Sequence, residues 1–315
     1  MKTEPGKPPS QPVLTGPIPA SHAANLPRGI GLWWRAIRPR TLSIAAAPVL
    51  AGTALAFAEQ ERFNLFVLAA TLTGALAIQA GTNLFNDVAD YLKGGDQPLR
   101  QGPPRVTAMG WASPHQVKRA ALVSFLMAAL CGLFLVLEGG IPILILGLAA
   151  LWSGWAYSLG ARPIAYTPLG ELFVIAFFGL GAVGGTYYLQ TLNLTASALS
   201  VGLALGLFAA GVLMVNNYRD MEPDRLAGRR TLAILVGPDM SRVFFAACTL
   251  LPFALVLMPP GPRGAWMTLF LLPYAFLLIH RFKTLPRGPA FNQILAATAR
   301  LELAFAILIA TGATL

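Results

Sequence analysis

The aspartates of this chain are concentrated in two short stretches, and the first one follows a long uncharged segment. Residues 63–82 contain no charged side chain, and Asn83, Asn86, Asp87 and Asp90 then follow in quick succession. Because these positions lie at i, i+3, i+4 and i+7, a helix would place all four side chains on one face. Carboxylates held that close repel one another unless a cation shares them. Mg²⁺ suits the pattern, since it binds one or two carboxylates and completes its coordination shell with water and substrate phosphate oxygens.

A second stretch of the same kind also ends an uncharged segment. Asn216, Asp220 and Asp224 lie at i, i+4 and i+8, again on one helical face. A single pair of such aspartates is more often a solvated helix end than a site. However, five of the six aspartates in the chain fall within the two stretches. Ionisable groups beside lipid are costly, so two such clusters indicate a shared, functional ligand site.

Basic side chains accompany both stretches and suit a diphosphate. Carboxylates would hold Mg²⁺, the metal would bridge to the diphosphate, and the basic side chains would neutralise the remaining charge. The predicted metal ligands are Asp87, Asp90, Asp96, Asp220 and Asp224, and the predicted diphosphate-binding residues are Lys93, Arg105, Arg219 and Arg230. The alternative is that these arginines lie in cytoplasmic loops and bind anionic lipid headgroups.

A third segment, residues 152–171, is rich in aromatic side chains and ends in a carboxylate. Tyr157 and Tyr166 are candidates to contact the substrate, because aromatic faces shield a carbocation. The alternative for each aromatic is an interfacial belt at the membrane surface. Glu171 begins an apolar segment, where it would orient a substrate hydroxyl or pair with Arg162. The amides Asn83, Asn86 and Asn216 complete the predicted substrate-binding set.

Composition places this chain among polytopic membrane proteins. Its 315 residues are 56% hydrophobic and 11% charged, and the mean hydropathy is +0.63, whereas a soluble domain has about 25% charged residues. The net charge of +10 does not indicate nucleic acid, because the basic residues are spread between apolar segments. Cys131 and Cys248 each lie within an apolar run, so we predict neither a disulfide nor a metal site for them.

The apolar segments predict an all-α bundle of nine transmembrane helices. A span needs about 20 apolar residues, and the candidates are 41–58, 65–86, 120–137, 141–159, 169–189, 197–217, 242–259, 264–280 and 291–314. We expect a disordered tail over residues 1–28 and a transmembrane domain over residues 29–315, which opens with an interfacial helix near residues 33–40. The last span contains Arg300 and Glu302, so either these face the bundle interior or the span starts later.

The distribution of basic residues predicts the orientation. Nine spans with a cytoplasmic N-terminus place 20 of the 23 lysines and arginines on the cytoplasmic side. Both Asp stretches then lie at the cytoplasmic ends of their spans. Their loops, 89–118 and 219–241, carry much of the basic charge, and we predict the active site there.

These motifs resemble the UbiA superfamily of intramembrane prenyltransferases, over about residues 33–315. The resemblance rests on residues 86–90, 93–96 and 102–105 in the first region, on 216–220, 224–225 and 228–232 in the second, and on 38–42 and 162–173. Members of the 4-hydroxybenzoate branch usually have an Arg directly after the second Asp, and another Asp three residues beyond. Here Tyr91 follows Asp90 and the next aspartate is Asp96. The chain is therefore more similar to the branch that prenylates 1,4-dihydroxy-2-naphthoate.

The resemblance implies a nine-helix bundle around a central cavity capped by cytoplasmic loops. It implies an Mg²⁺-dependent enzyme of the cell inner (plasma) membrane, surrounded by membrane lipid, that uses polyprenyl diphosphate and an aromatic acceptor. In the naphthoate branch the acceptor loses its carboxylate and becomes demethylmenaquinone. Pro223 disfavours a regular helix before Asp224, so we expect Asp224 on a bent helix end. The alternatives are another aromatic prenyltransferase of the superfamily, such as the 4-hydroxybenzoate type, or a secondary transporter of an anionic or lipidic solute.

Overall fold

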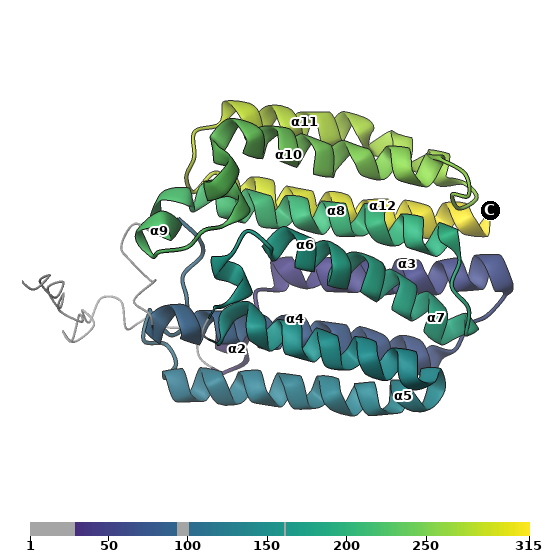
Figure 1. Cartoon of the computed structure of the whole chain (residues 1–315), viewed down its shortest axis with the longest axis horizontal. Coiled ribbons are helices and arrows are strands. Elements are labelled where there is room, and N and C mark those ends of the chain that lie inside the picture. Colours follow the sequence, from purple (N-terminus) through teal and green to yellow (C-terminus); the bar gives the residue numbers. More distant parts are fainter. Residues whose placement is uncertain (1–28, 93–100, 161) are drawn as a thin grey trace, which may run out of the picture.

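The structure, a computed structural model, describes residues 29–92, 101–160 and 162–315, and over these ranges its regular elements are all helices (Figure 1). Eight of the helical segments are long and apolar enough to cross a membrane. The elements are α2 (Ile30–Ala36), α3 (Pro39–Gln60), α4 (Leu65–Leu92), α5 (Pro114–Ser158), η1 (Ile164–Tyr166), α6 (Gly170–Val174), η2 (Ile175–Gly184), α7 (Gly185–Thr191), α8 (Ala196–Arg219), α9 (Met221–Leu226), α10 (Leu232–Leu257), η3 (Ala265–Leu271), α11 (Leu272–Thr284) and α12 (Phe291–Thr314).

Helix α5 accounts for the difference between eight helices and nine predicted spans. A straight helix of its 45 residues would be about 68 Å long, twice the thickness of a bilayer core. Gly140 has φ 67° and ψ −152°, which is not helical, and Figure 1 shows the chain reversing direction within α5. The two halves correspond to the predicted spans 120–137 and 141–159. Counted this way, the described residues contain nine crossing segments, as predicted.

The other predicted boundaries also agree with the helices. The segments α6, η2 and α7 form one continuous rod of 22 residues, of which η2 is wound as a π-helix. The rod ends just before Leu192, whose left-handed φ of 56° terminates the helix. This is the point at which the long uncharged run was predicted to divide into two spans. The predicted interfacial helix corresponds to α2. The predicted tail, residues 1–28, lies outside the described residues.

Helix α8 occupies the centre of the bundle and is the most extensively buried span. Glycines let it approach η2 closely: a Cβ added to Gly179 would lie 2.4 Å from the carbonyl oxygen of Gly202 and 2.6 Å from the Cα of Gly206. Such small residues allow helices to pack backbone against backbone in membranes. The contact fixes the separation of α6 and α8, whose ends carry residues of the candidate site.

The last span begins at Phe291, so the question raised by its two charged residues has a clear answer. Glu302 is fully buried (0% exposed), whereas Arg300 is exposed. One charged side chain therefore faces the interior and the other faces outward. Neither carboxylate oxygen of Glu302 has a hydrogen-bond partner.

The elements that bear the predicted site residues converge at one end of the bundle. Helices α2 and α9 both lie at the left end in Figure 1, beside the end of α4. The C-terminal ends of α4, α5 and α8 and the start of α6 contribute to one pocket there. Segments far apart in the sequence thus meet around the same space.

Candidate active site

A polar pocket of about 660 Å³, including its opening, lies at this end of the bundle. Side chains from both Asp stretches line it, together with residues of α5, of the 160–170 segment and of the junction between α2 and α3. Its lining comprises Arg38, Asn86, Asp90, Arg105, Tyr157, Ala165, Thr167, Gly170, Leu213, Asn216, Asn217, Asp220, Pro223, Asp224 and Arg229. The pocket therefore brings together two stretches that are more than a hundred residues apart in sequence.

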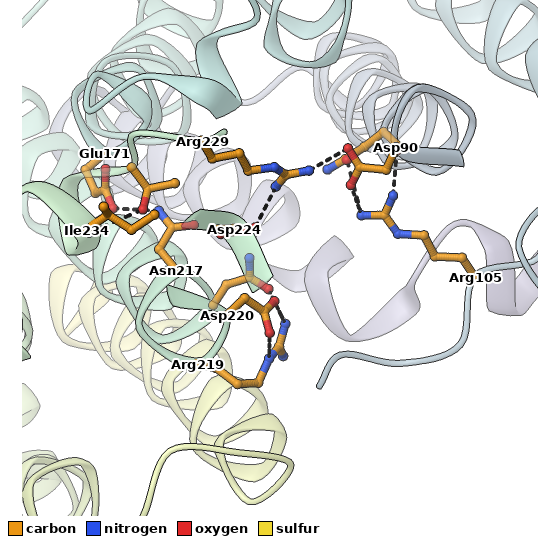
Figure 2. Close-up of polar contacts among 12 residues, drawn as sticks. Asp90, Arg105, Glu171, Asn217, Arg219, Asp220, Asp224, Arg229 and Ile234 are labelled. Carbon is orange, nitrogen blue, oxygen red and sulfur yellow. Dashed lines mark hydrogen bonds and ion pairs between the residues drawn. The ribbon is translucent and has the colours of Figure 1, made fainter. Parts of the chain in front are cut away.

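Asp90 connects the two halves of this pocket (Figure 2). It stands near the end of α4 and is 4% exposed. Its Oδ2 forms an ion pair with Arg105, from the loop that follows α4. Its Oδ1 accepts a hydrogen bond of 2.5 Å from Arg229, which follows α9. Charge-assisted bonds of this kind are among the strongest in proteins, so Asp90 joins the first motif to the second.

Arg229 extends the network to Asp224. Its Nη1 lies 3.3 Å from Asp224 Oδ1, and its guanidinium lies 4.8 Å from the ring centroid of Tyr166. Burial disfavours the charged form of Arg229, but the Asp90 and Asp224 carboxylates outweigh it and raise the pKa of the guanidinium. Burial also raises the pKa of Asp224 to about 7, although Arg229 acts in the opposite direction. Asp224 Oδ2 is buried with no hydrogen-bond partner.

Asp220 is held by its own neighbour in sequence. It lies between α8 and α9 with φ −97° and ψ 14°, so its side chain does not continue the face of α8. Arg219 donates to both carboxylate oxygens, Nε at 2.9 Å and Nη2 at 2.5 Å. The same guanidinium donates to Asn216 Oδ1 at 2.8 Å and to Asn292 Oδ1 at 2.6 Å. Arg219 therefore fixes the position of Asp220 and does not itself line the pocket.

The structure places Asp87 outside the pocket lining, although it lies one turn before Asp90. It is 2% exposed, and its two oxygens accept the backbone N–H groups of Val106 and Thr107 at 3.0 and 3.1 Å. These bonds anchor the loop that carries Arg105. The metal-ligand role of Asp87 stays a prediction, and the observed geometry gives this carboxylate a loop-holding role.

The three amides of the prediction have different surroundings. Asn216 and Asn86 line the pocket, and Arg105 donates to the backbone carbonyl of Asn86 at 2.9 Å. Asn83 does not line it; its Nδ2 donates to Ile37 O at 2.9 Å and to Thr41 Oγ1 at 3.1 Å. Asn83 therefore holds the junction between α2 and α3.

Glu171 lies at the start of α6, just behind the pocket wall. It is 2% exposed, and its Oε1 accepts a hydrogen bond of 2.9 Å from Asn217 Nδ2 (Figure 2). Its Oε2 is buried with no hydrogen-bond partner. Asn217 and Tyr157 line the pocket, so Asn217 stands between Glu171 and any bound molecule.

The remaining predicted residues fall into two groups. Lys93 and Asp96 lie outside the described residues. Arg230 is exposed, and its backbone N–H donates to Tyr166 O at 3.0 Å. The neighbouring Arg229 lines the pocket and Arg230 does not, so the diphosphate-binding role of Arg230 stays a prediction. Sequence reasoning also did not select Arg38 and Asn217. Asn217 directly follows Asn216 on α8, and Arg38 directly precedes Pro39, but neither spacing indicated a pocket residue.

The donor set fits a hard divalent cation. Asp90, Asp220 and Asp224 line one pocket with three amide side chains, and oxygen ligands of this kind suit Mg²⁺ better than Zn²⁺. In the described part of the chain, no three carboxylate, imidazole or thiolate groups are close enough to hold a metal together, because arginines lie between them. Arg229 pairs with both Asp90 and Asp224, so metal binding at these carboxylates would require the guanidinium to release them. The unpartnered Asp224 Oδ2 is already available as a ligand.

The sequence is similar to one family of prenyltransferases. The model of the UbiA prenyltransferase family matches residues 45–297. The 1,4-dihydroxy-2-naphthoate octaprenyltransferase of Haemophilus influenzae is 36% identical over 230 residues, which cover 71% of this chain and 74% of that protein. The enzyme of the same name from Escherichia coli is 36% identical over 220 residues, covering 68% and 71%.

Solved structures show the same fold. A UbiA homolog from Archaeoglobus fulgidus, bound to GPP and Mg²⁺, aligns with a TM-score of 0.64 over 89% of this chain and 99% of the homolog, at 15% identity. A UbiA homolog from Aeropyrum pernix K1 aligns with the same TM-score over 86% and 96%, at 17% identity. The sequence match spans most of the nine-segment bundle and both Asp stretches, and this chain therefore belongs to the UbiA prenyltransferase family of integral membrane proteins.

Proposed function

We propose that this protein transfers a polyprenyl group from polyprenyl diphosphate to 1,4-dihydroxy-2-naphthoate, with loss of the acceptor's carboxylate, in menaquinone biosynthesis. The observation that carries the proposal is the convergence of both Asp stretches and several arginines on one pocket above an apolar bundle. A charged headgroup with a long apolar tail matches that distribution of polar and apolar surface. The names of the relatives from H. influenzae and E. coli support the choice of acceptor.

Mg²⁺ is the proposed cofactor, held by Asp90, Asp220 and Asp224, with Asp87 and Asp96 as further predicted ligands. When bound, it would neutralise negative charge that develops on the leaving diphosphate. The chain's own contribution is to supply guanidiniums at the same place. Arg105 and Arg229 both pair with Asp90, so they can turn to the diphosphate oxygens when the carboxylates bind metal. Arg219 keeps Asp220 in position throughout.

The walls of the pocket would protect the allylic cation and orient the acceptor. Tyr157 from α5 and Leu213 from α8 are among the lining residues; an aromatic face would stabilise positive charge, and an apolar side chain would help to exclude water. Asn217, fixed by Glu171 at 2.9 Å, would present an amide to an acceptor hydroxyl. The electron-rich naphthoate ring then forms the new C–C bond, and loss of its carboxylate restores aromaticity without a strong general base.

The proposed location is the inner membrane of the cell, with the pocket on the cytoplasmic side. The N-terminal basic residues and both site loops would then share the cytoplasmic face, as the positive-inside rule favours. On that face the pocket meets its water-soluble acceptor, while the apolar tail of the donor remains in the lipid.

The decisive experiment is a competition between two acceptors, using purified protein, Mg²⁺ and one polyprenyl diphosphate. We expect 1,4-dihydroxy-2-naphthoate to be consumed in preference to 4-hydroxybenzoate, and the product mass to be that of demethylmenaquinol, or of demethylmenaquinone after the product has been oxidised by air. The Asp90→Asn protein is the control for a contaminating activity, since it should form little of either product. Preference for 4-hydroxybenzoate, with its carboxylate retained in the product, would contradict the proposal and move the chain to the other branch.

A further inference from the structure

Arg38 occupies an unusual position at the edge of the pocket. It is the second of the two residues between α2 and α3, and its backbone is left-handed, with φ 56° and ψ 70°. Left-handed backbone is uncommon outside glycine, and it persists only where the surroundings impose it. The conformation lets the chain enter α3 at Pro39 while the Arg38 side chain lines the pocket.

Asn83 is the residue that imposes this conformation. Its side-chain amide, from α4, donates to Ile37 O at 2.9 Å and to Thr41 Oγ1 at 3.1 Å, thus bracketing Arg38 on both sides. Thr41 Oγ1 also donates to the carbonyl of Arg38 at 2.9 Å. The first Asp stretch therefore begins with a side chain that fixes the junction bearing Arg38.

The charge of Arg38 is not compensated as those of its neighbours are. Arg105 and Arg229 both form ion pairs with Asp90, and Arg219 forms an ion pair with Asp220. Within the described ranges Arg38 has no ion pair, and its buried Nη2 has no hydrogen-bond partner. Burial, and then the positive charge of Arg105, lower the pKa of Arg38 to about 10. The side chain is therefore still a cation at neutral pH. The residue as a whole is half-buried, but its buried Nη2 has no partner, which is unfavourable unless an anion joins it.

We propose that Arg38, positioned by Asn83, binds an anionic oxygen pair of a substrate in this pocket. The inference rests on the proposed function, which supplies two such anions: the carboxylate of the acceptor and the diphosphate of the donor. A guanidinium presents parallel donors that suit either group. Arg38 forms no ion pair with Asp90, although the negative charges of Asp87 and Asp90 act on its pKa in the direction opposite to burial. It could therefore bind an anion without first releasing a carboxylate partner.

The test compares Arg38→Gln with the unchanged protein in two sets of measurements. The first measures KM and kcat for 1,4-dihydroxy-2-naphthoate, and inhibition by 1,4-dihydroxynaphthalene, which lacks the carboxylate. The second measures inhibition by inorganic diphosphate with Mg²⁺. Arg40→Gln is the matched control, since Arg40 is exposed on the first turn of α3 and does not line the pocket.

If Arg38 binds the acceptor carboxylate, KM for the naphthoate rises about 10- to 100-fold, the scale of a lost charge-assisted bond, while inhibition by the diol is unchanged. If it binds the diphosphate, the inhibition constant for diphosphate rises by that factor instead. Arg38→Lys should recover part of the loss, because it keeps the charge without the paired donors. Asn83→Ala should show a weaker form of the same KM effect, with Arg40→Gln unchanged.

Less than a twofold change in every binding measurement, in folded Arg38→Gln protein, would overturn the inference. Should that variant fail to fold, Arg38→Lys carries the test, and normal constants for both ligands would again overturn it. The diphosphate measurement does not depend on the acceptor. A protein that rejects the naphthoate therefore refutes the proposed function, while Arg38 is still tested separately.

Discussion

Asp87 and Asp90 are three residues apart on α4, yet they have different hydrogen-bond and ion-pair partners. Asp90 lies between two guanidiniums at the pocket, whereas Asp87 accepts two backbone N–H groups from the following loop. Their helical spacing predicted the same metal-binding role for both, but the residues that contact them come from other segments of the chain. Substitution can separate the two roles.

We expect Asp90→Asn to lower turnover by about 10²-fold or more, the scale of removing one preorganised electrostatic group. Asp220→Asn and Asp224→Asn should behave similarly, because each removes a carboxylate from the same pocket. Steady-state rates of prenyl transfer and the Mg²⁺ concentration dependence provide the measurement. Near-normal turnover of Asp90→Asn and Asp220→Asn in folded protein would show that the metal is held elsewhere.

Asp87→Asn should instead loosen the loop around Val106 and Thr107. We expect faster hydrogen exchange or proteolysis over residues 101–113, together with reduced activity and an Mg²⁺ requirement close to normal. A large shift of the Mg²⁺ requirement with an unchanged loop would establish Asp87 as a ligand.

The pKa of Asp224 predicts how stability depends on pH. Burial raises it to about 7 from the usual 3.8, so between these values the folded state holds a proton that the unfolded state has lost. Stability should therefore fall as the pH rises from about 4 to 7, and this contribution should level off above 7. Thermal unfolding of the metal-free protein in detergent would measure it. Asp224→Asn should flatten the slope, and an equal slope in the variant would contradict the assignment.

At the scale of elements, α12 contains a buried carboxyl whose removal should stabilise the bundle. Glu302 is fully buried and neither oxygen has a hydrogen-bond partner; a polar group buried in this way costs about 1–3 kcal/mol. We therefore expect Glu302→Leu, which is similar in size, to raise the unfolding temperature. Arg300→Leu, on the exposed face of the same turn, is the control and should change little. A lower unfolding temperature for Glu302→Leu would mean that the carboxyl has a structural partner.

Most of the helices were predictable from the sequence, because apolar length alone determines where a chain can cross a bilayer. The break near Leu192 was placed within a few residues, since an uncharged run too long for one crossing must be divided. The predicted spans 120–137 and 141–159 likewise meet at the reversal at Gly140. The bent end carrying Asp224 was expected from Pro223 and is the short helix α9. The interior orientation of Glu302 was not decided by its sequence, because that depends on which neighbours cover it.

Part of the pocket was also predictable, from the spacing of polar residues at the ends of the predicted spans. Spacing placed Asp90, Asn216, Asp220 and Asp224 on helix ends that share one side of the membrane, and they do meet. Pairing between side chains was not predictable, because it depends on loop geometry. The selection of Arg229 over Arg230, and the positions of Arg38 and Asn83, follow from turns whose backbone angles no spacing rule specifies.

For the whole molecule, the position of the pocket makes the orientation testable. A single cysteine at Leu226, which is 65% exposed on α9, should resist an impermeant thiol reagent added to intact cells. A cysteine at Glu61, between α3 and α4, should react. Both are made after replacing Cys131 and Cys248, and permeabilised cells confirm that each site is reactive. The opposite labelling pattern would place the pocket outside and refute the proposed orientation.

The pairing of arginines with the protein's own aspartates also bears on how a product leaves. A guanidinium that turns from Asp90 to a diphosphate can turn back, so the carboxylate competes with the departing anion for the same donor. Release is then an exchange of partners within the protein, and no bare charge has to face the lipid at any moment. An enzyme at the edge of a membrane can in this way bind a highly charged leaving group firmly and still discharge it into water.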